Sequence, residues 1–448
     1  MEKLLFGRIP VWLALLFAIL GFLGSSFFGV LLVDHYEGDR KFGSLSTKSA
    51  QLAQLPKKVF SDVSGPDPMA VAEHHQARMD GLSGWVLEEG VEPPDGFVIL
   101  SRYDGDVRSH VIELVDLSDF RTVHRWEPDA DELFASVESK MEINRVPSWT
   151  TDKFRYIHPL IFEDGDLLVK DHSSPLFRLS PCGDMRWFNF EDKFHHSTEM
   201  DADGHIWVPT RIQPSRLPVG GRFRDDAVTK VTADGDILYQ KSLTEVFLDN
   251  DLGYHLMAVE DYNFDPIHLN DIEPVNSDGP YWKKGDVFVS MRSKSIVALF
   301  RPSTEKFVWM KKGPWTAQHD VDILDESRIA VYSNNSMTWG QGVYVNGVNE
   351  IMVYDFETDE VTLPFQTHME KLGVSTEFEG LSEHMSGQRL FIEEENAGRI
   401  LIIEPDQTVA QYVNRGKDGV IYRLGWSRYL SREDGGAVAR TLESTNCP

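Results

Sequence analysis

The stretch GPWTAQHDVDILDESRIAVYSN, residues 313–334, contains the pattern from which we predict the fold. After His319, apolar residues alternate with polar ones at Val321 and Ile323, and a polar turn then leads into a second apolar run over 329–332. Alternation with a period of two, followed by a turn and a run rich in β-branched residues, predicts two adjacent strands of a sheet.

The same plan recurs along the chain. A turn leads into an apolar run at DGFVIL (from Asp95), DGDLLV (Asp164), DGHIWV (Asp203), KGDVFV (Lys284), ESRIAV (Glu326) and GQRLFI (Gly387). A second strand follows each run, and most units then have a third short strand that carries an aromatic residue. Six units of about four strands, spaced about 40 to 80 residues apart, are typical of a β-propeller, whereas two stacked β-sandwiches would not explain their common internal order.

We therefore predict an all-β fold, a six-bladed β-propeller preceded by an N-terminal transmembrane helix. The stretch DGVIYRLGWSRYL, from Asp418, is expected either to close the ring against the first blade or to begin a seventh blade.

Four of the six units place a histidine at a similar position, seven or eight residues before the turn or at the start of the corresponding strand: His158, His196, His268 and His319. Because the inner strands of a propeller surround a central channel, residues at equivalent positions converge on its axis. We expect these histidines to lie together at one end of the channel.

A second set of polar residues lies seven positions after each turn: His172, Arg211, Arg292, Asn334 and Glu394. Most of these side chains donate hydrogen bonds, which is unusual for strands with a purely structural role. The two sets together predict a channel mouth of imidazole, guanidinium and amide groups, which suits an anionic ligand.

Three interpretations of the histidines remain open. They can be structural and bond neighbouring strands. They can hold a metal ion, but this needs three or four ligands at short distances and would place two arginines beside the cation, so we expect no metal. One neutral imidazole can instead act as a nucleophile while the others and an arginine stabilise negative charge.

Several segments resemble the arylsulfate sulfotransferase family of six-bladed propeller enzymes from the bacterial periplasm. They are HHSTEMDADGHIWV (from His195), DPIHLNDIEPV (from Asp265), the segment from Gly285 to Leu324, and SRIAVYSNN (from Ser327). The resemblance covers about residues 150–410. It is most specific over 268–335, where the D-P-x-H-x-N, S-x-R and Q-H-D elements follow one another in the family's order.

The resemblance implies transfer of a sulfuryl group from an aryl sulfate to a phenol, without a nucleotide sulfate donor or any cofactor. His319 matches the histidine that is transiently sulfated. The residues that match positions binding the sulfuryl oxygens or assisting proton transfer are His196, His268, Asn270 and Arg292. We expect catalysis by His319, His268, His196 and Arg292, and substrate binding by Asn270, Arg211, His158 and Asn334.

Two alternatives to this function stay open: a non-catalytic propeller whose channel binds a ligand or a partner protein, and a lyase or hydrolase that uses the same histidines as acid and base. Because a protonated imidazole cannot attack sulfur, we expect sulfotransfer to rise as the pH passes through the histidine range.

The chain has 448 residues and a formal net charge of −27, which opposes binding to nucleic acid and to anionic membrane surfaces. An anion site therefore needs a locally positive mouth, for which the candidates are Arg211, Arg292, Lys294 and Lys312. The two cysteines, Cys182 and Cys447, have no metal-type spacing, and whether they pair is open.

The N-terminus carries an apolar run over 9–33 without a charged residue. About 20 apolar residues cross a bilayer, and neither the short apolar core nor the small-residue site of a cleaved signal peptide is present. We interpret the run as an uncleaved signal anchor. Lys3 and Arg8 precede it, which favours a cytoplasmic N-terminus and a periplasmic or extracellular C-terminal domain.

The expected organisation is a cytoplasmic N-terminus (1–8), the transmembrane anchor (9–33), a membrane-proximal stalk (34–94), the propeller catalytic domain (95–432) and a C-terminal tail (433–448). The adjacent His74 and His75 are interpreted as part of an exposed helix rather than as a pair of ligands.

Overall fold

The computed structural model describes residues 10–37, 41–46, 48–50, 52–53, 67–138, 149–212, 215, 217, 223–256, 264–339 and 342–447. The chain divides into two compact units, one of residues 1–68 with 214–223 and the other of residues 69–213 with 224–448. The first unit contains α2 (Val11–Glu37), of which the stretch Val11–Asp34 is long and apolar enough to cross a membrane. The expected cytoplasmic segment 1–8 lies outside the described residues.

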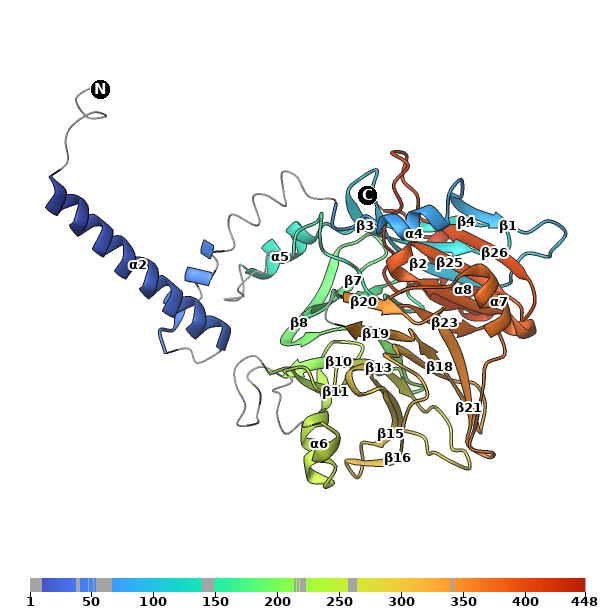
Figure 1. The fold of residues 1–448 in the computed structure, drawn as a ribbon. Coiled ribbons are helices and arrows are strands. Elements are labelled where there is room, and N and C mark those ends of the chain that lie inside the picture. The colour runs from blue at the N-terminus through green and yellow to red at the C-terminus, as the bar shows by residue number, and fades with distance from the viewer. Residues whose placement is uncertain are drawn as a thin grey trace. The chain divides into compact units, whose positions relative to one another are not determined.

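The second unit is a propeller-like ring of antiparallel sheets (Figure 1), so the all-β class predicted from the apolar runs is confirmed. One sheet contains β27 (Arg428–Leu430), β2 (Phe97–Asp104), β3 (Ser109–Asp116) and β4 (Arg121–Trp126). An eight-stranded sheet contains β5 (Leu160–Ile161), β6 (Leu167–Val169), β7 (Ser174–Leu179), β8 (Met185–Phe194), β9 (Glu199–Met200), β10 (Ile206–Ile212), β11 (Asp225–Val231) and β12 (Ile237–Ser242).

The remaining sheets follow in chain order. A four-stranded sheet contains β13 (Leu269–Pro274), β14 (Val287–Met291), β15 (Ile296–Arg301) and β16 (Lys306–Lys312). Another contains β17 (Asp320–Ile323), β18 (Arg328–Ser333), β21 (Glu350–Asp355) and β22 (Glu360–Thr362), with the separate hairpin β19 (Ser336–Trp339) and β20 (Gly342–Val345). A five-stranded sheet contains β1 (Gly84–Leu87), β26 (Thr408–Val413), β25 (Arg399–Ile403), β24 (Leu390–Glu394) and β23 (Leu381–His384).

The apolar runs in the sequence form the second strand of each set, and they are buried on both faces. Every residue of β10, β14 and β24 is buried, because neighbouring sheets pack against both faces of each strand. Outer strands such as β16 are half exposed. The repeated apolar run is therefore the sequence signal of a packed middle strand.

The inner strands, each paired with one apolar run, gave a weaker signal, and the sequence predicted only some of them, as at Val321 and Ile323. These strands are β5, β9, β13, β17, β23 and β27, and residues from all six line one common pocket, so they are the inner strands of the ring. They are short and carry polar residues, for example two residues in β9 and the sequence DVDI in β17. A strand that faces a channel does not require apolar side chains on that face, so most of these strands lack a long apolar run.

The ring is closed by the two ends of the second unit. Strand β27 pairs with β2, with Leu430 opposite Phe97, which confirms the closing role expected as one alternative for the stretch from Asp418. Strand β1 pairs with β26 in the last sheet. Residues of the segment expected to be a stalk, 34–94, therefore contribute to the sheets.

The C-terminal residues are part of the folded unit. The hydroxyl of Ser431 accepts a hydrogen bond from the N–H of Asp434 and begins α8 (Arg432–Glu443), whose buried Leu442 joins the core. A Cβ at Gly435 would lie 2.5 Å from the ring of Phe97, so glycine permits the close approach of this helix. A disulfide joins Cys447 to Cys182, which settles the open question of their pairing.

The described part of the second unit has four further helices, of which α4 precedes β1 and the others connect strands. They are α4 (Glu73–Arg78), α5 (Ala130–Glu138), α6 (Leu243–Asp249) and α7 (Gln366–Leu372), with the short 3₁₀ turns η1 (Gly253–His255), η2 (Arg292–Lys294), η3 (Ser386–Gln388) and η4 (Glu395–Ala397).

Candidate active site

A non-glycine residue in the left-handed conformation precedes each inner strand. These residues and their φ angles are His158 (48°), His196 (53°), His268 (53°), Ala317 (51°), Glu379 (56°) and Trp426 (57°). Such φ values are uncommon for residues with a Cβ, and they cluster at functional sites. Three of the four predicted histidines share this position. His319 lies two residues after it, so the four histidines do not occupy one structural slot as the sequence comparison assumed.

Five of the eight predicted site residues line one cavity of about 330 Å³. They are His196, His268, His319, Arg211 and Arg292. The other lining residues are His172, Ser173, Arg224, Phe378 and Glu379. The expectation that histidines and arginines from distant units converge on one mouth thus agrees with the structure.

The hydrogen bonds of His319 determine which of its nitrogens can attack. Its Nδ1 lies 2.6 Å from Oδ1 of Asn334 and 3.2 Å from the carbonyl oxygen of Ala317, and both oxygens only accept. Its Nε2 lies 3.1 Å from the backbone nitrogen of Glu379, which only donates. Nδ1 therefore carries the hydrogen, and Nε2 carries the lone pair of a nucleophile.

Burial holds the pKa of His319 well below the usual histidine value, and the charges of Arg292 and His268 act in the same direction. A lowered pKa keeps the imidazole neutral, because desolvation and nearby cations both disfavour the imidazolium form. The expected rise of activity with pH therefore moves below the ordinary histidine range.

A carboxylate orients His268. Its Nδ1 lies 2.8 Å from Oδ2 of Asp265, which also accepts a hydrogen bond of 2.7 Å from Arg224. Because a carboxylate only accepts, Nδ1 of His268 donates, and its Nε2 remains for a ligand or a proton.

His196 lies at the centre of the histidine cluster. Its ring centroid is 4.5 Å from that of His172, 5.3 Å from that of His268 and 6.3 Å from that of His319. Its Nδ1 lies 2.8 Å from Nδ1 of His195, so one of the two carries the shared hydrogen. Burial lowers the pKa of His196 well below the usual value, so the ring that lines the cavity is held neutral.

Two of the lining arginines are paired, and one is not. Arg211 lies 3.3 Å from Asp226, and Arg224 lies 2.7 Å from Asp265. Among the described residues, Arg292 has no carboxylate within ion-pair distance; its Nε is buried without a hydrogen-bond partner, and its guanidinium lies against the ring of Phe378. Arg292 is therefore the guanidinium best able to bind an incoming anion.

Glu379 is a negative group in the cavity, and its charge is balanced locally. Its carboxylate lies 2.8 Å from Nε2 of His172 and 3.1 Å from the guanidinium of Arg155. Although burial alone would raise it, Arg155 and His172 hold the pKa of Glu379 well below the usual value. Arg155 also binds Glu395 at 2.6 Å, which ties the cavity wall to η4.

Three predicted binding residues do not line the cavity. Asn334 lies beside His319 and donates from Nδ2 to the carbonyls of Thr376 (3.1 Å) and Glu379 (2.6 Å), so it orients the nucleophile. The amide of Asn270 donates to the carbonyl of Gln318 at 3.0 Å and supports the residue before His319.

The third such residue, His158, accepts a hydrogen bond of 3.2 Å from the N–H of Thr198 and packs edge-on against Trp426. Of the second polar set, His172, Arg211 and Arg292 line the cavity, whereas Glu394 binds Arg78 and Arg399. Spacing along the chain placed these residues near the channel mouth but did not indicate which side chains enter the cavity.

Several residues that support the site were not predicted. Lys170 is fully buried and donates to the carbonyl oxygens of Ile157 (3.2 Å) and His196, and burial lowers its pKa to about 7. The sequence carried a usable signal for Asp265, which stands three residues before His268, and for His195, which adjoins His196. No local signal pointed to Lys170 or to Glu379.

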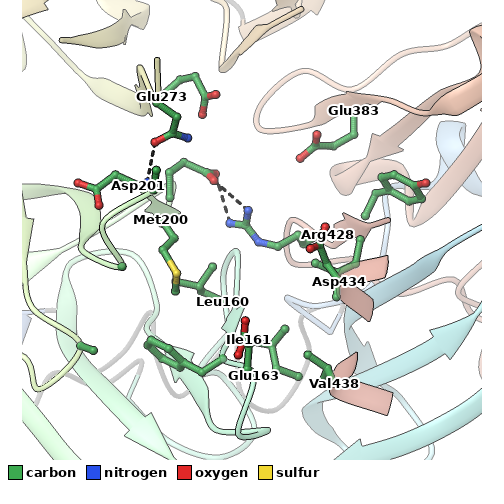
Figure 2. A pocket seen from close by; sticks show the side chains of 18 of the residues that line it. Leu160, Ile161, Glu163, Met200, Asp201, Glu273, Glu383, Arg428, Asp434 and Val438 are labelled. Atoms are coloured by element: carbon green, nitrogen blue, oxygen red, sulfur yellow. Dashed lines mark hydrogen bonds and ion pairs between the residues drawn. The ribbon is translucent and has the colours of Figure 1, made fainter. Parts of the chain in front are cut away.

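The inner strands turn from basic to acidic along their length. After the histidine positions, the same strands supply the carboxylates of a second pocket of about 1120 Å³, which are Glu199, Asp271, Glu273, Asp320, Asp322 and Glu383. Figure 2 shows Arg428 extending into this pocket, where its guanidinium lies 2.9 Å from the carboxylate of Glu199. Burial raises the pKa of Asp271 to about 8 and that of Glu383 to about 7. An anion therefore meets favourable charge at the histidine cavity rather than in this pocket.

The predicted basic mouth is confirmed only in part. Arg211 and Arg292 line the cavity, whereas Lys294 and Lys312 are not among its lining residues. Arg224 adds a third guanidinium that the sequence comparison did not include.

The adjacent His74 and His75 bind a carboxylate rather than forming only an exposed helix. His75 is buried, and the Nε2 atoms of His74 and His75 lie 3.1 and 2.9 Å from Glu377. Arg78 donates to Nδ1 of His75 at 2.8 Å, so Nε2 of that ring carries the hydrogen that bonds Glu377. This arrangement fits a hydrogen-bonded clamp better than a metal site, since a metal requires the lone pair of Nε2.

A family model described as arylsulfotransferase (ASST) matches residues 158–415. This range contains all eight residues predicted for the site. No curated protein matched the chain in sequence.

Among solved structures, the fold is similar to a protein of unknown function from Bacteroides caccae, with 12% identity, a TM-score of 0.45, and coverage of 73% of this chain and 98% of that one. It is also similar to Kuenenia stuttgartiensis hydrazine synthase, with 11% identity, a TM-score of 0.37 and coverage of 72% and 79%. A streptogramin B lyase has 13% identity, a TM-score of 0.37 and coverage of 78% and 98%. Scores at this level carry no argument about function.

Proposed function

The chain belongs to the arylsulfotransferase family, and on this premise we propose that it moves a sulfuryl group from an aryl sulfate to a phenol through a sulfated His319. The family places the chain among sulfuryl-transfer enzymes. The observation that carries the specific mechanism is the hydrogen-bonding of His319, which leaves the lone pair of Nε2 at a cavity lined by three arginines.

In the first half-reaction, Nε2 of His319 forms a bond to sulfur while the bond between sulfur and the aryl oxygen breaks. The electron pair of that bond goes to the aryl oxygen, which receives a proton from His268, and the phenol leaves. Asp265 stabilises the imidazolium form of His268 through the 2.8 Å hydrogen bond at Nδ1. The backbone N–H of Glu379 must release Nε2 at this point, and it then faces the transferred oxygens.

Negative charge is spread over the three sulfuryl oxygens in the transition state, as in phosphoryl transfer. Arg292, which has no carboxylate partner among the described residues, is the principal ligand of these oxygens in our proposal. His196 and Arg211 complete the set of donors around the cavity. Preorganised donors of this kind stabilise the transition state more than the ground state.

In the second half-reaction, a phenol enters and gives its proton to His268, and its oxygen attacks sulfur. The bond between sulfur and Nε2 breaks, and its electron pair returns to the imidazole. The covalent intermediate divides exchange between two phenols into two steps at one cavity, which gives ping-pong kinetics. The cycle consumes no metal or nucleotide.

We further propose six blades for the ring. The eight-stranded sheet holds two consecutive sets of four strands, β5 to β8 and β9 to β12, joined where β8 pairs with β10. Six left-handed residues precede six inner strands. Both observations support six repeats of four strands, with β27 completing the first repeat.

The proposed location is the membrane, with the second unit on the periplasmic or extracellular side. The apolar stretch of α2 is long enough to act as an anchor. The disulfide between Cys182 and Cys447 supports an oxidising compartment for the catalytic unit, because disulfides persist there and are rare in the cytosol. In this proposal residues 9–33 span the bilayer and the catalytic domain extends from near residue 69 to the C-terminus.

The test uses the full chain in detergent with a chromogenic aryl sulfate, with and without an added phenol. We expect repeated dye release to require the phenol, with only about one equivalent per enzyme released by the donor alone. Mass spectrometry after mixing with the donor alone should find an acid-labile SO₃ adduct on the peptide that contains His319. His319→Ala should lose both signals, whereas His205→Ala, outside the cavity, should keep them.

Two results would reject the proposal. Dye release without a phenol and without an adduct would identify a hydrolase that uses the histidines as acid and base. A folded protein that binds the aryl sulfate but gives neither dye nor adduct would identify a non-catalytic binding module.

A further inference from the structure

Phe378 stands apart from the other residues of the cavity. Of the ten described residues that line it, Phe378 is the single apolar side chain, and 41% of its surface is exposed. The other nine are histidines, arginines, a serine and a glutamate. An exposed aromatic ring at a polar cavity offers a stacking face that the buried core does not use.

Hydrogen bonds hold the backbone of Phe378 in place at the edge of the cavity. The N–H of Phe378 donates to Oδ1 of Asn396 at 3.0 Å, and its carbonyl accepts from the hydroxyl of Thr376 at 2.9 Å. The next residue, Glu379, bonds Nε2 of His319 through its N–H. The ring is thus attached directly to the segment that contacts the nucleophile.

The ring is also adjacent to the free guanidinium. The central carbon of Arg292 lies 5.2 Å from the ring centroid of Phe378, within the range of a cation–π contact. In an aryl sulfate a single ester oxygen separates the sulfate from the ring. The subsites for these two parts must therefore be neighbours, as Arg292 and Phe378 are.

Resting on the proposed function, we propose that Phe378 is the specificity-determining residue that stacks against the aryl ring of the substrate while Arg292 holds its sulfate. The cavity then selects aryl sulfates over alkyl sulfates by one aromatic contact. A stacked pair of rings contributes enough to change affinity by about tenfold.

The experiment measures binding rather than turnover. The full chain carrying His319→Ala, in detergent, is titrated with phenyl sulfate and with ethyl sulfate by calorimetry. We expect phenyl sulfate to bind about tenfold more tightly than ethyl sulfate. In this background Phe378→Ala should remove the preference for phenyl sulfate, whereas Phe378→Tyr, which keeps an aromatic ring, should retain it.

Two further variants make the result specific. Phe378→Leu keeps an apolar side chain of similar size without a ring, so it should also lose the preference if Phe378→Ala proves unstable in thermal melts. Phe190→Ala removes a phenylalanine with the same 41% exposure that does not line the cavity, and it should leave the preference unchanged.

The outcomes separate this inference from the proposed function. If both esters bind but the preference for phenyl sulfate persists in Phe378→Ala and Phe378→Leu, the role of Phe378 is refuted while a sulfate ester site remains. If neither ester binds to any folded variant, the cavity is not a sulfate ester site, and both proposals fail.

Discussion

Replacing Asn334 by leucine should slow the first half-reaction by removing a contact of the nucleophile. Asn334 does not line the cavity, but its Oδ1 lies 2.6 Å from Nδ1 of His319, and its Nδ2 donates to the carbonyls of Thr376 and Glu379. Leucine has a similar volume and neither hydrogen-bonding atom. The substitution therefore removes the main acceptor that keeps the hydrogen on Nδ1.

The size of the effect follows from the bonds that remain. A buried polar group left without its partner costs about 1–3 kcal/mol, and each 1.36 kcal/mol of barrier is about tenfold in rate. The carbonyl of Ala317, 3.2 Å from Nδ1, remains as a weaker acceptor, so the hydrogen does not leave Nδ1 entirely. We expect the half-reaction to slow by roughly ten- to a hundredfold, with little change in the affinity for the donor.

The assay is a single turnover with excess enzyme and a chromogenic aryl sulfate at pH near 8, followed by stopped flow. Asn334→Asp is the matched control, because it also loses the donors to Thr376 and Glu379 but keeps an acceptor for Nδ1. Asn334→Asp should therefore be faster than Asn334→Leu. A folded Asn334→Leu protein at the wild-type rate, or two variants that are equally slow, would refute the orienting role of Oδ1.

Because burial holds the pKa of His319 well below the usual value, protonation of this ring should slow dye release only below the ordinary histidine range, and an acid midpoint near the ordinary histidine pKa would contradict this. Burial raises the pKa of Glu383 from 4.5 to about 7. Between these pH values the folded protein keeps a proton on Glu383 that the unfolded chain has released. The free energy of unfolding should therefore fall as the pH rises through this range. Glu383→Gln should therefore stabilise the protein by up to about 3 kcal/mol at pH 8 but little at pH 5 in thermal melts, and equal effects at both pH values would count against it. Reducing the disulfide between Cys182 and Cys447, which are 265 residues apart, should lower the free energy of unfolding by roughly 2–5 kcal/mol. Sulfuryl transfer by the folded protein should stay intact, because neither cysteine lines the cavity. Loss of transfer without unfolding would show that the disulfide shapes the site.

The middle strands could be predicted from the sequence, whereas the inner strands were recognised only in part, as where Val321 and Ile323 alternate with polar residues in β17. A strand packed on both faces must be apolar, so runs such as that of β14 are visible without a structure. A strand that faces the channel has no such requirement. Comparing histidine positions between units found the site because the inner strands carry it. The comparison allowed an offset of one residue, and it therefore aligned His319 with the position that Ala317 occupies in the structure.

The candidate site also contains residues that the sequence predicted and residues that it did not. Residue type and repeat position brought His196, His268, His319, Arg211 and Arg292 together correctly. The roles of their neighbours depend on contacts between distant segments.

The sequence alone determined the all-β repeat, the family, the apolar N-terminal stretch and the residue types at the channel mouth, because hydrophobic pattern and local motifs are properties of short stretches of chain. Only the tertiary structure decided that Asn334 orients His319 rather than lining the cavity, that Phe378 and Glu379 enter it, and that Cys182 meets Cys447. These facts depend on side-chain direction and on contacts between residues far apart in the chain, which closure of the ring creates and no local pattern encodes.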